Sequence, residues 1–462
     1  MKVTVIGSGL AGTLVCNELV KKHSVTLLEA GPKASIEYPK LYFLKKQLAG
    51  VKTFCLGGGG TTNLWHNGLM PIQQQDVTSK DFRLVLGKAE QYHDKAAENL
   101  FWLANPYMST YRNVFSKISS LVQKTGSFPD GVDCLLYPKK YSALKVVPEV
   151  NGIYSVSGIE FKMKGNKVIG IDYSVGKKIY SAETDRVIVC AGCFGTPLII
   201  KKVLADLGQP SESAGVGLAD HPLGFVGKVR VKKVFNKEIK QLSVKDWGNF
   251  ESRAGIRVKS NCGKYTGCAF LRPALTMENK LSIYKYKSLL GASSGVERLK
   301  NMFSWKLFHP DILAEIVSHL FGITIPGRLY NILFLFEQKR GDSHVKQNDS
   351  GFEIDWSITP KELEIYKGMV DKLKSMLLGI ADDMNIEKNI TDDWLWSAAH
   401  HSGTISMGQG SGDLVDMDLK LKASDNVFVC DGSIVQEHSY ANTGLTIGAL
   451  AIRLAEKINN EK

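Results

Sequence analysis

The N-terminal pattern of hydrophobic and polar residues predicts a strand, a helix and a second strand in close succession. Residues 2–6 alternate around β-branched side chains, residues 10–20 carry apolar side chains at helical spacing, and residues 24–28 form another apolar strand. Near the other end, residues 426–430 predict a buried strand, and the stretch from Thr443 onward spaces its apolar side chains as a helix does.

The middle of the chain shows a different pattern. Residues 225–235, 250–260 and 351–359 alternate polar and apolar side chains, which predicts antiparallel strands. Residues 358–384 predict a helix that is opened by Thr359-Pro360, with Glu362 at the spacing of a capping box.

Residues 299–336 carry many large apolar side chains among lysines and arginines. This pattern predicts a pair of helices buried against a sheet. The alternatives are a lid over an apolar substrate, or a surface that contacts a membrane or a protein partner.

Composition narrows the class of protein. The chain has 462 residues, of which 44% are hydrophobic and 23% charged, so two globular domains are expected. The net charge of +12 comes from scattered basic residues and fits a soluble basic enzyme. An anionic substrate, an acidic redox partner or an anionic membrane surface are the alternatives, and nothing beyond charge favours nucleic-acid binding.

No apolar run reaches the roughly 18 residues that a membrane span requires, and the first residues already form a strand, so a cytoplasmic location is expected. Among eight cysteines, only Cys190 and Cys193 stand at C-x-x-C spacing, and we interpret them as buried structural thiols rather than a redox pair. No cysteine and histidine pattern indicates a zinc or haem site.

Residues 7–12 read G-x-G-x-x-G between the first strand and the helix. In this context Gly7 permits the tight turn, Gly9 lets the backbone approach a pyrophosphate, and Gly12 lets helix and strand pack closely. Glu29 ends the second strand, where an acid binds a ribose. The segment therefore predicts a dinucleotide site, without distinguishing FAD from NAD.

Residues 55–65 add a run of glycines, two threonines and an asparagine. This composition suits a backbone that lies along an extended cofactor, although a generic glycine loop is an alternative for this segment alone.

Five segments together resemble the glucose-methanol-choline (GMC) oxidoreductases. They are the fingerprint with residues 29–31, the loop 59–62, the segments 187–197 and 215–222, and the C-terminal block of residues 400–408 and 427–458. The resemblance implies an α/β fold: a Rossmann-like FAD-binding domain, related to p-hydroxybenzoate hydroxylase, and an α+β substrate domain built on an antiparallel sheet. It divides the chain into FAD-binding parts 1–75, 141–224 and 396–462, a connecting or lid region 76–140, and a substrate domain 225–395.

The resemblance also implies which residues contact FAD. These are Gly7, Gly9, Leu10, Ala11, Gly12, Glu29, Ala30, Gly59, Gly60, Thr61, Thr62, Asn63, Ala191, Gly192, Asp431, Gly432, Asn442 and Thr443. The surroundings of Trp65 and of Asn442 look most like the pyranose oxidase and bacterial sugar dehydrogenase branch. Leu64 stands where pyranose oxidases carry the histidine that binds flavin covalently, so noncovalent FAD is expected, with His66 as a less favoured attachment point.

His400, three residues before Gly403-Thr404, takes the place of the family's catalytic base, and Asn442 takes the place of its partner. A neutral imidazole suits proton removal from an alcohol because its pKa lies near ambient pH. His401 is the alternative base, since neighbours in an extended segment point to opposite faces.

Two further histidines receive other interpretations. Asp220-His221 is expected to be structural or to border the cofactor, without a role as base. His438 is expected in a solvated loop, with a place in the pocket wall as the alternative.

The expected function is FAD-dependent oxidation of an alcohol, namely a sugar or glycoside hydroxyl, with an external acceptor favoured over oxygen. A non-redox lyase of the same fold, an oxidoreductase for an apolar alcohol at a membrane surface, and a binding protein with a vestigial site are the alternatives. The chain is short for the family, so an open pocket is also expected.

Overall fold

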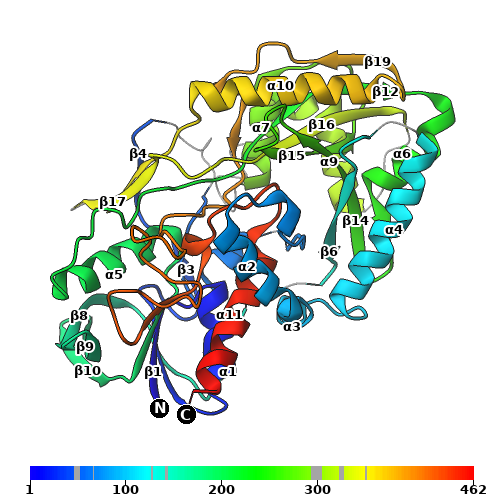
Figure 1. The fold of residues 1–462 in the computed structure, drawn as a ribbon. Coiled ribbons are helices and arrows are strands. Elements are labelled where there is room, and N and C mark those ends of the chain that lie inside the picture. The colour runs from blue at the N-terminus through cyan, green and yellow to red at the C-terminus, as the bar shows by residue number, and fades with distance from the viewer. Residues whose placement is uncertain are drawn as a thin grey trace.

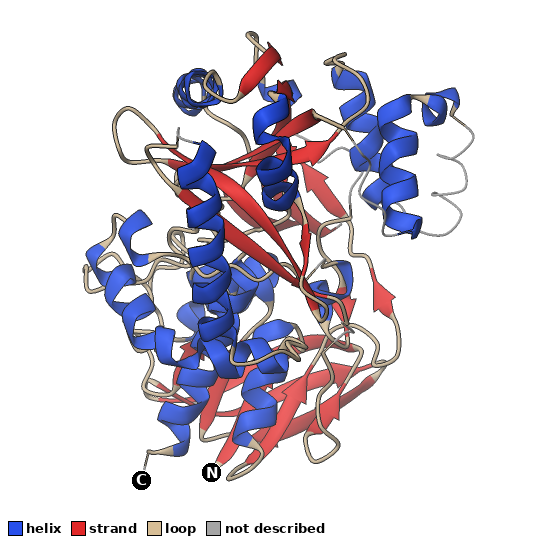
Figure 2. Cartoon of the chain, turned by 90° about the vertical axis from the view of Figure 1, so that its right-hand side faces the viewer, coloured by secondary structure: helices blue, strands red, loops and turns tan. Residues whose placement is uncertain are grey.

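The computed structural model describes residues 1–45, 52–65, 67–125, 128–140, 144–292, 304–321, 327–348 and 351–461. Two large sheets dominate them, with the N- and C-terminal ends lying close together beside the first (Figures 1 and 2). This first sheet is wholly parallel, in the order β21 (Val427–Val429), β11 (Arg186–Val189), β1 (Lys2–Ile6), β2 (Ser24–Leu28) and β7 (Asn151–Ile153).

The parallel sheet confirms the strands predicted at both ends of the chain. Between β1 and β2 runs α1 (Leu10–Leu19), which packs against the last helix, α11 (Thr443–Asn459). Gly12 in α1 is required for the contact of this helix with the turn after β1, because a β-carbon there would lie 1.8 Å from the carbonyl oxygen of Gly7. The helix therefore approaches the turn that follows β1 more closely than any side chain allows.

The second sheet is antiparallel and lies at the other end of the molecule (Figure 1). Its order is β13 (Lys245–Asp246), β14 (Phe250–Lys259), β15 (Thr266–Pro273), β16 (Leu329–Phe336), β12 (Pro222–Val231) and β19 (Ala381–Ile386), with β6 (Val132–Pro138) paired to β14 and β20 (Trp396–Ser397) paired to β12. The mixed α/β fold expected from the sequence is thus confirmed.

Helices cover both sheets. Those beside the parallel sheet are α2 (Lys80–Ala89), α3 (His93–Asn99) and α5 (Gly192–Asp206), and those beside the antiparallel sheet are α4 (Tyr107–Thr125), α6 (Asn236–Ser243) and α10 (Pro360–Leu377). Helix α10 begins with the predicted capping box: the Thr359 hydroxyl accepts from the Glu362 backbone N–H, and the Glu362 carboxylate accepts from the Thr359 N–H.

Smaller sheets complete the fold. They are β8 (Val156–Lys164), β9 (Lys167–Val175) and β10 (Lys178–Glu183); β17 (His344–Asn348), β18 (Gly351–Asp355) and β4 (Leu41–Phe43); and β3 (Ile36–Glu37) with β5 (Leu56–Gly57). The strands predicted near residues 225 and 250 are confirmed as antiparallel β12 and β14. The strand predicted at residue 351 exists as β18, which pairs antiparallel with β17 as predicted and parallel with β4, in a small sheet outside the large one.

The pair of helices predicted over residues 299–336 is wrong for the second half of that range. Residues 329–336 form β16 in the interior of the antiparallel sheet. Among the described residues of the range, Trp305–Phe308 form a short 3-10 helix, and α9 (Pro310–Phe321), next to α7 (Leu281–Ala292), is α-helical. A short apolar run fits a buried strand and a buried helix equally well, so periodicity could not separate them. The side chains of Trp305 and Phe308 are 84% and 72% exposed, and residues 299–303 lie outside the described part.

Within the described residues, no helix combines the length and the apolarity that crossing a membrane requires.

Candidate active site

A cavity of about 1320 Å³ lies between the two large sheets. Small-molecule pockets usually measure about 300 to 1,000 Å³, so this space exceeds the need of one small ligand and suits an extended cofactor together with a substrate. One wall consists of the turns that follow β1, β11 and β21, and the facing wall consists of side chains from the antiparallel sheet.

Most of the residues predicted to contact FAD line this cavity. They are Gly7, Gly9, Leu10, Ala11, Glu29, Ala30, Gly60, Thr61, Thr62, Asn63, Ala191, Gly192, Asp431, Gly432, Asn442 and Thr443. Gly12 and Gly59 lie behind them: Gly12 permits the packing of α1, and Gly59 takes a left-handed backbone with φ of 84°. Segments far apart in the sequence are thus brought to one surface.

Gly9 shows directly that the cavity fits a ligand. A β-carbon at Gly9 would meet no protein atom within 4 Å, and its φ of −66° is open to any residue, so neither packing nor backbone geometry requires glycine. Gly60, in contrast, sits against Gly9, with its β-carbon position 2.9 Å from the Gly9 Cα. The space in front of Gly9, at the N-terminus of α1, therefore suits a phosphate group that lies against the backbone.

The carboxylate of Glu29 is buried and fully bonded within the protein. One oxygen accepts from the Ser8 N–H (2.7 Å) and hydroxyl (2.8 Å), and the other accepts from the backbone N–H groups of Gly31 (2.8 Å) and Gly57 (3.0 Å). A carboxylate offers about four acceptor positions, so all are filled. The Ser8 hydroxyl also lies 3.0 Å from the Gly57 carbonyl oxygen, and its turn toward that oxygen would free one position for a ribose hydroxyl.

Asp431 links two of the cofactor turns. Its carboxylate accepts from the Gly192 N–H (2.8 Å) and the Ser433 N–H (2.8 Å), and also from the Thr196 hydroxyl. Burial raises the pKa of Asp431, while these hydrogen bonds act in the opposite direction. The residue therefore fixes the start of α5 against the turn after β21.

His400 and Asn442 meet at the same place in the cavity. The amide nitrogen of Asn442 lies 3.3 Å from His400 Nε2, and Asn442 precedes the first residue of α11, as expected. The backbone amides at this helix N-terminus face the cavity, where they favour negative charge. His400 is half-buried at the cavity wall, and the loss of hydration there lowers its pKa, opposed by the nearby carboxylate of Asp220.

His221 determines which nitrogen of His400 carries hydrogen. His221 Nε2 lies 2.8 Å from the carbonyl oxygen of Ser439, which only accepts, so this nitrogen must be the donor. Burial holds the pKa of His221 well below its usual range, so the ring is neutral and its Nδ1 is an acceptor. His221 Nδ1 lies 2.8 Å from His400 Nδ1, which must therefore donate. The lone pair of His400 is left on Nε2, beside Asn442.

Asp220 anchors this group of histidines. Its carboxylate is buried and accepts from the backbone N–H groups of His221 (2.6 Å) and His400 (2.9 Å) and from the Ser397 hydroxyl. His401 Nδ1 lies 2.9 Å from the same carboxylate. Both histidines line the cavity, but only His400 has its free nitrogen beside Asn442, which favours His400 over His401 as the base.

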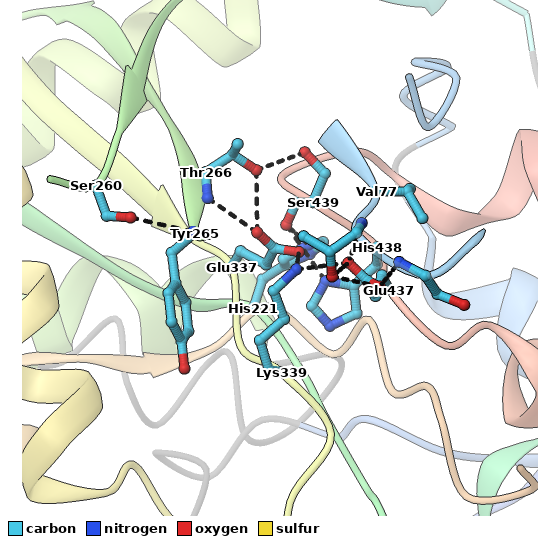
Figure 3. Close-up of polar contacts among 12 residues, drawn as sticks. Val77, His221, Ser260, Tyr265, Thr266, Glu337, Lys339, Glu437, His438 and Ser439 are labelled. Atoms are coloured by element: carbon cyan, nitrogen blue, oxygen red, sulfur yellow. Dashed lines mark hydrogen bonds and ion pairs between the residues drawn. The ribbon is translucent and has the colours of Figure 1, made fainter. Parts of the chain in front are cut away.

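Ser439 is held by a polar network on the side away from the cavity, drawn in Figure 3. Its backbone is left-handed, with φ of 53°, and its hydroxyl lies 2.8 Å from the Thr266 hydroxyl. Thr266 donates to Glu337, which is paired with Lys339, and Lys339 also contacts Glu437 at 2.6 Å. Burial raises the pKa of Glu337 to about 7. The network thus fixes the strained carbonyl that orients His221.

Two expectations for histidines need revision. His438 does not lie in a solvated loop: it is fully buried, and its ring centroid is 3.9 Å from that of His221. His221 makes no contact with Asn442, which fits a structural residue. It nevertheless forms a hydrogen bond with His400, the candidate base. In the sequence, the neighbouring Asp220 and His221 were the available signal for this contact. The partner, His400, lies 179 residues from His221.

The remaining predictions concern cysteines and the flavin attachment point. Cys190 and Cys193 are free, buried thiols, and burial raises the pKa of both. Leu64 lines the cavity, as do its neighbours in the glycine loop, while His66 lies outside the described residues. Among the described residues, no group of side chains is arranged to hold a metal ion.

Residues 345–451, which include His400 and Asn442, match the family model described as GMC oxidoreductase. The family match covers this C-terminal segment, and solved structures share the fold of the whole chain. Structures similar to this chain include pyridoxine 4-oxidase from Mesorbium loti, with a TM-score of 0.61 at 14% identity over 100% of this chain and 99% of that one. An FAD-dependent oxidoreductase from Chaetomium thermophilum gives 0.57 at 14% identity, over 99% and 98%. No match was found among curated protein sequences.

Gly9 provides a test of the cofactor position in this fold. Gly9→Ala should leave the free energy of unfolding unchanged, since no protein atom opposes the methyl group. It should weaken FAD binding about tenfold or more, a loss near 1.4 kcal/mol, because the methyl group occupies the cofactor's space. Fluorescence titration with FAD and urea unfolding measure the two effects, and Gly368→Ala in α10, where a β-carbon also meets no atom within 4 Å, is a control outside the cavity wall. Unchanged FAD affinity would contradict the assignment.

Proposed function

We propose that the chain oxidises an alcohol to a carbonyl compound with noncovalently bound FAD. The observation that carries this proposal is the pairing of His400 Nε2 with the Asn442 amide at 3.3 Å, in a cavity that the predicted cofactor residues also line. One structural neighbour is named an FAD-dependent oxidoreductase, which supports this cofactor. FAD, when bound, supplies the acceptor for the hydride of the substrate.

The residues of the chain supply positioning and proton transfer. A substrate hydroxyl between the two groups would accept a hydrogen bond from Asn442 Nδ2 and donate one to His400 Nε2. His400 then takes the hydroxyl proton as the C–H bond breaks. The resulting imidazolium keeps its Nδ1–H bond to His221 and is stabilised by the negative charge of Asp220. The backbone amides at the start of α11 would stabilise negative charge on a group bound close to them in the cavity.

For the substrate, a sugar or glycoside hydroxyl remains the expectation from the family resemblance, with an external electron acceptor rather than oxygen. A second candidate is an apolar alcohol taken up at a membrane surface. The observation that favours it is the exposure of Trp305 and Phe308, at 84% and 72%, on a chain of net charge +12.

The decisive experiment is an anaerobic absorbance scan of the FAD-loaded protein with sugars, glycosides, pyridoxine and simple aromatic and aliphatic alcohols. At least one alcohol should bleach the flavin band. His400→Ala should retain FAD but slow bleaching by about 10²–10⁴-fold, the usual contribution of a general base. If no alcohol bleaches the bound flavin, the redox assignment fails and the non-redox lyase takes its place.

The pH dependence should show that the base is neutral at physiological pH. Burial lowers the pKa of His400 from 6.5, so the base is lost only as pH falls below that value. With an alcohol that does not itself titrate, kcat/KM should stay level from neutral pH down to about pH 6.5 and decline below it. An acid limb centred above pH 6.5 would contradict a half-buried, neutral His400.

Removal of His221 should act on the proton transfer step and leave substrate binding intact. In His221→Leu, His400 Nδ1 loses its acceptor, the tautomer is no longer fixed, and kcat should fall about 10- to 100-fold, as for other partners that fix an imidazole. KM should change little, because Asn442 still binds the hydroxyl. His221→Gln, whose amide oxygen can accept from His400, should recover most of the rate.

His93→Leu serves as the control for the loss of a buried histidine, since His93 lies on α3 outside the cavity wall. Equal losses of kcat in His93→Leu and His221→Leu, or no recovery in His221→Gln, would count against the positioning role.

A further inference from the structure

The wall of the cavity that faces the cofactor turns is built from alternate residues of the antiparallel sheet. Because side chains alternate between the two faces of a strand, one face of each strand points into the cavity. Most of these side chains are apolar, among them Phe225, Phe270, Leu333 and Leu335. Three charged residues interrupt this apolar surface: Glu251 and Arg253 on β14, and Arg272 on β15.

Arg253 lines the same cavity as Asn442, and Tyr137 and the backbone of Gly68 link the two regions. A β-carbon added at Gly68 would lie 3.1 Å from the ring of Tyr137 and 3.5 Å from the amide nitrogen of Asn442, so both side chains lie close to Gly68. The guanidinium of Arg253 sits over the Tyr137 ring, 4.8 Å from its centroid. An aromatic contact of this kind orients the guanidinium plane and leaves its edge for hydrogen bonding.

The charge of Arg253 is not neutralised by a protein carboxylate. Among the described residues, no ion pair involves Arg253, and its buried Nε makes no hydrogen bond. Glu251 lies two residues away on the same strand but forms no ion pair with it in the described part of the chain. Arg272 also lines this wall, on the neighbouring strand β15.

A cation on an apolar wall is stabilised by water until a ligand displaces that water, and it then needs an anionic partner. The planar guanidinium matches a carboxylate or a phosphate, which it can bind through two parallel hydrogen bonds. We propose that the substrates of this site are alcohols that carry an anionic group, a carboxylate or a phosphate, and that Arg253 binds this group while His400 and Asn442 hold the hydroxyl. This inference rests on the proposed alcohol oxidation, and it replaces the sugar expected from the family resemblance with an anionic, otherwise apolar alcohol.

The apolar residues around Arg253 define the rest of such a substrate. Aromatic and aliphatic side chains bury an unsubstituted hydrocarbon frame well, whereas a polyhydroxylated frame would leave its hydroxyls without partners there. A compact aromatic or aliphatic hydroxy acid, or the corresponding phosphate ester, therefore fits the wall. Because Arg253 fixes one end of this molecule, it limits which carbon atom of the substrate can lie next to the flavin.

The first test measures binding without turnover. The FAD-loaded protein is titrated with para-toluate, which has the carboxylate but no hydroxyl, and binding is followed by the flavin difference spectrum and by calorimetry. Arg253→Gln should raise the dissociation constant at least about tenfold, and Arg253→Lys should raise it less because the charge is kept. Arg230→Gln, which removes an exposed arginine from β12, is the matched control and should bind as the wild type does. Equal affinity in the wild type and Arg253→Gln would overturn the proposal.

The second test compares four alcohols that differ in one substituent: benzyl alcohol and its para-carboxylate, para-phosphate and para-aminomethyl derivatives. The carboxylate or the phosphate should reduce the flavin with a kcat/KM at least about tenfold above that of benzyl alcohol, and the amine should be the poorest. The ratio of anionic to neutral substrate should fall toward one in Arg253→Gln and persist in Arg230→Gln. The preferred anion identifies the natural group.

The two proposals fail in different ways. If benzyl alcohol or the amine is oxidised as fast as the anions, the substrate class is wrong and alcohol oxidation stands. If no alcohol reduces the flavin but Arg253→Gln still weakens toluate binding, the anion site stands and the redox function is wrong.

Discussion

The buried carboxylate of Asp220 is the interaction on which the candidate active site depends. Removing a charge from water is unfavourable unless hydrogen bonds replace the lost hydration. At Asp220 the replacements are the backbone N–H groups of His221 and His400, the Ser397 hydroxyl and the His401 ring. Burial alone would raise the pKa of Asp220, but His401 and these hydrogen bonds outweigh it and hold the pKa below its usual range. The carboxylate therefore stays charged and fixes the segment around His400 relative to β12.

The fold divides the work of the site between two walls. The turns of the parallel sheet provide backbone amides, glycines and helix N-termini, which suit a phosphate-containing cofactor. The antiparallel sheet provides side chains, which differ from one strand to the next and so determine what else fits. His400 and Asn442 lie where the two walls meet, on the segments that follow β20 and precede α11. Substitution of a few residues on β14 and β15 can therefore change which substrate fits, while the contacts to the cofactor stay the same.

The sequence predicted those parts of the structure that depend on residues close together in the chain. Alternation and glycine spacing were sufficient for β1, α1, β2 and α11, and the capping box located the start of α10. The same local signals failed for β16, where a short apolar run carries no period that separates a strand from a helix. Most predicted cofactor residues proved to share one cavity, because the turns after parallel strands lie at one edge of a sheet.

Side-chain networks between distant segments were beyond such reasoning. Nothing in the local sequence of His221 shows that it contacts His400, or that the Ser439 carbonyl orients it through a left-handed backbone. His438 was placed in solvent because loops are usually polar and exposed, whereas packing against His221 buries it completely. The hydrogen bonds that occupy all acceptor positions of Glu29 were equally hidden in the local sequence, because its partners Gly31 and Gly57 come from two separate turns.

The contact between α1 and α11 has a consequence for how the chain folds during synthesis. The buried side of α1 is covered by a helix made from residues 443–459, and β21 joins β11 from residues 427–429. Helix α1 is therefore synthesised long before α11. Its side chains Leu14, Val15 and Leu19, which are buried in the folded protein, stay exposed until then. Such an exposed apolar face is a natural target for chaperones and a source of aggregation. The nucleotide-binding unit is therefore complete only when nearly the whole chain has been translated, which ties cofactor uptake to the final stage of folding.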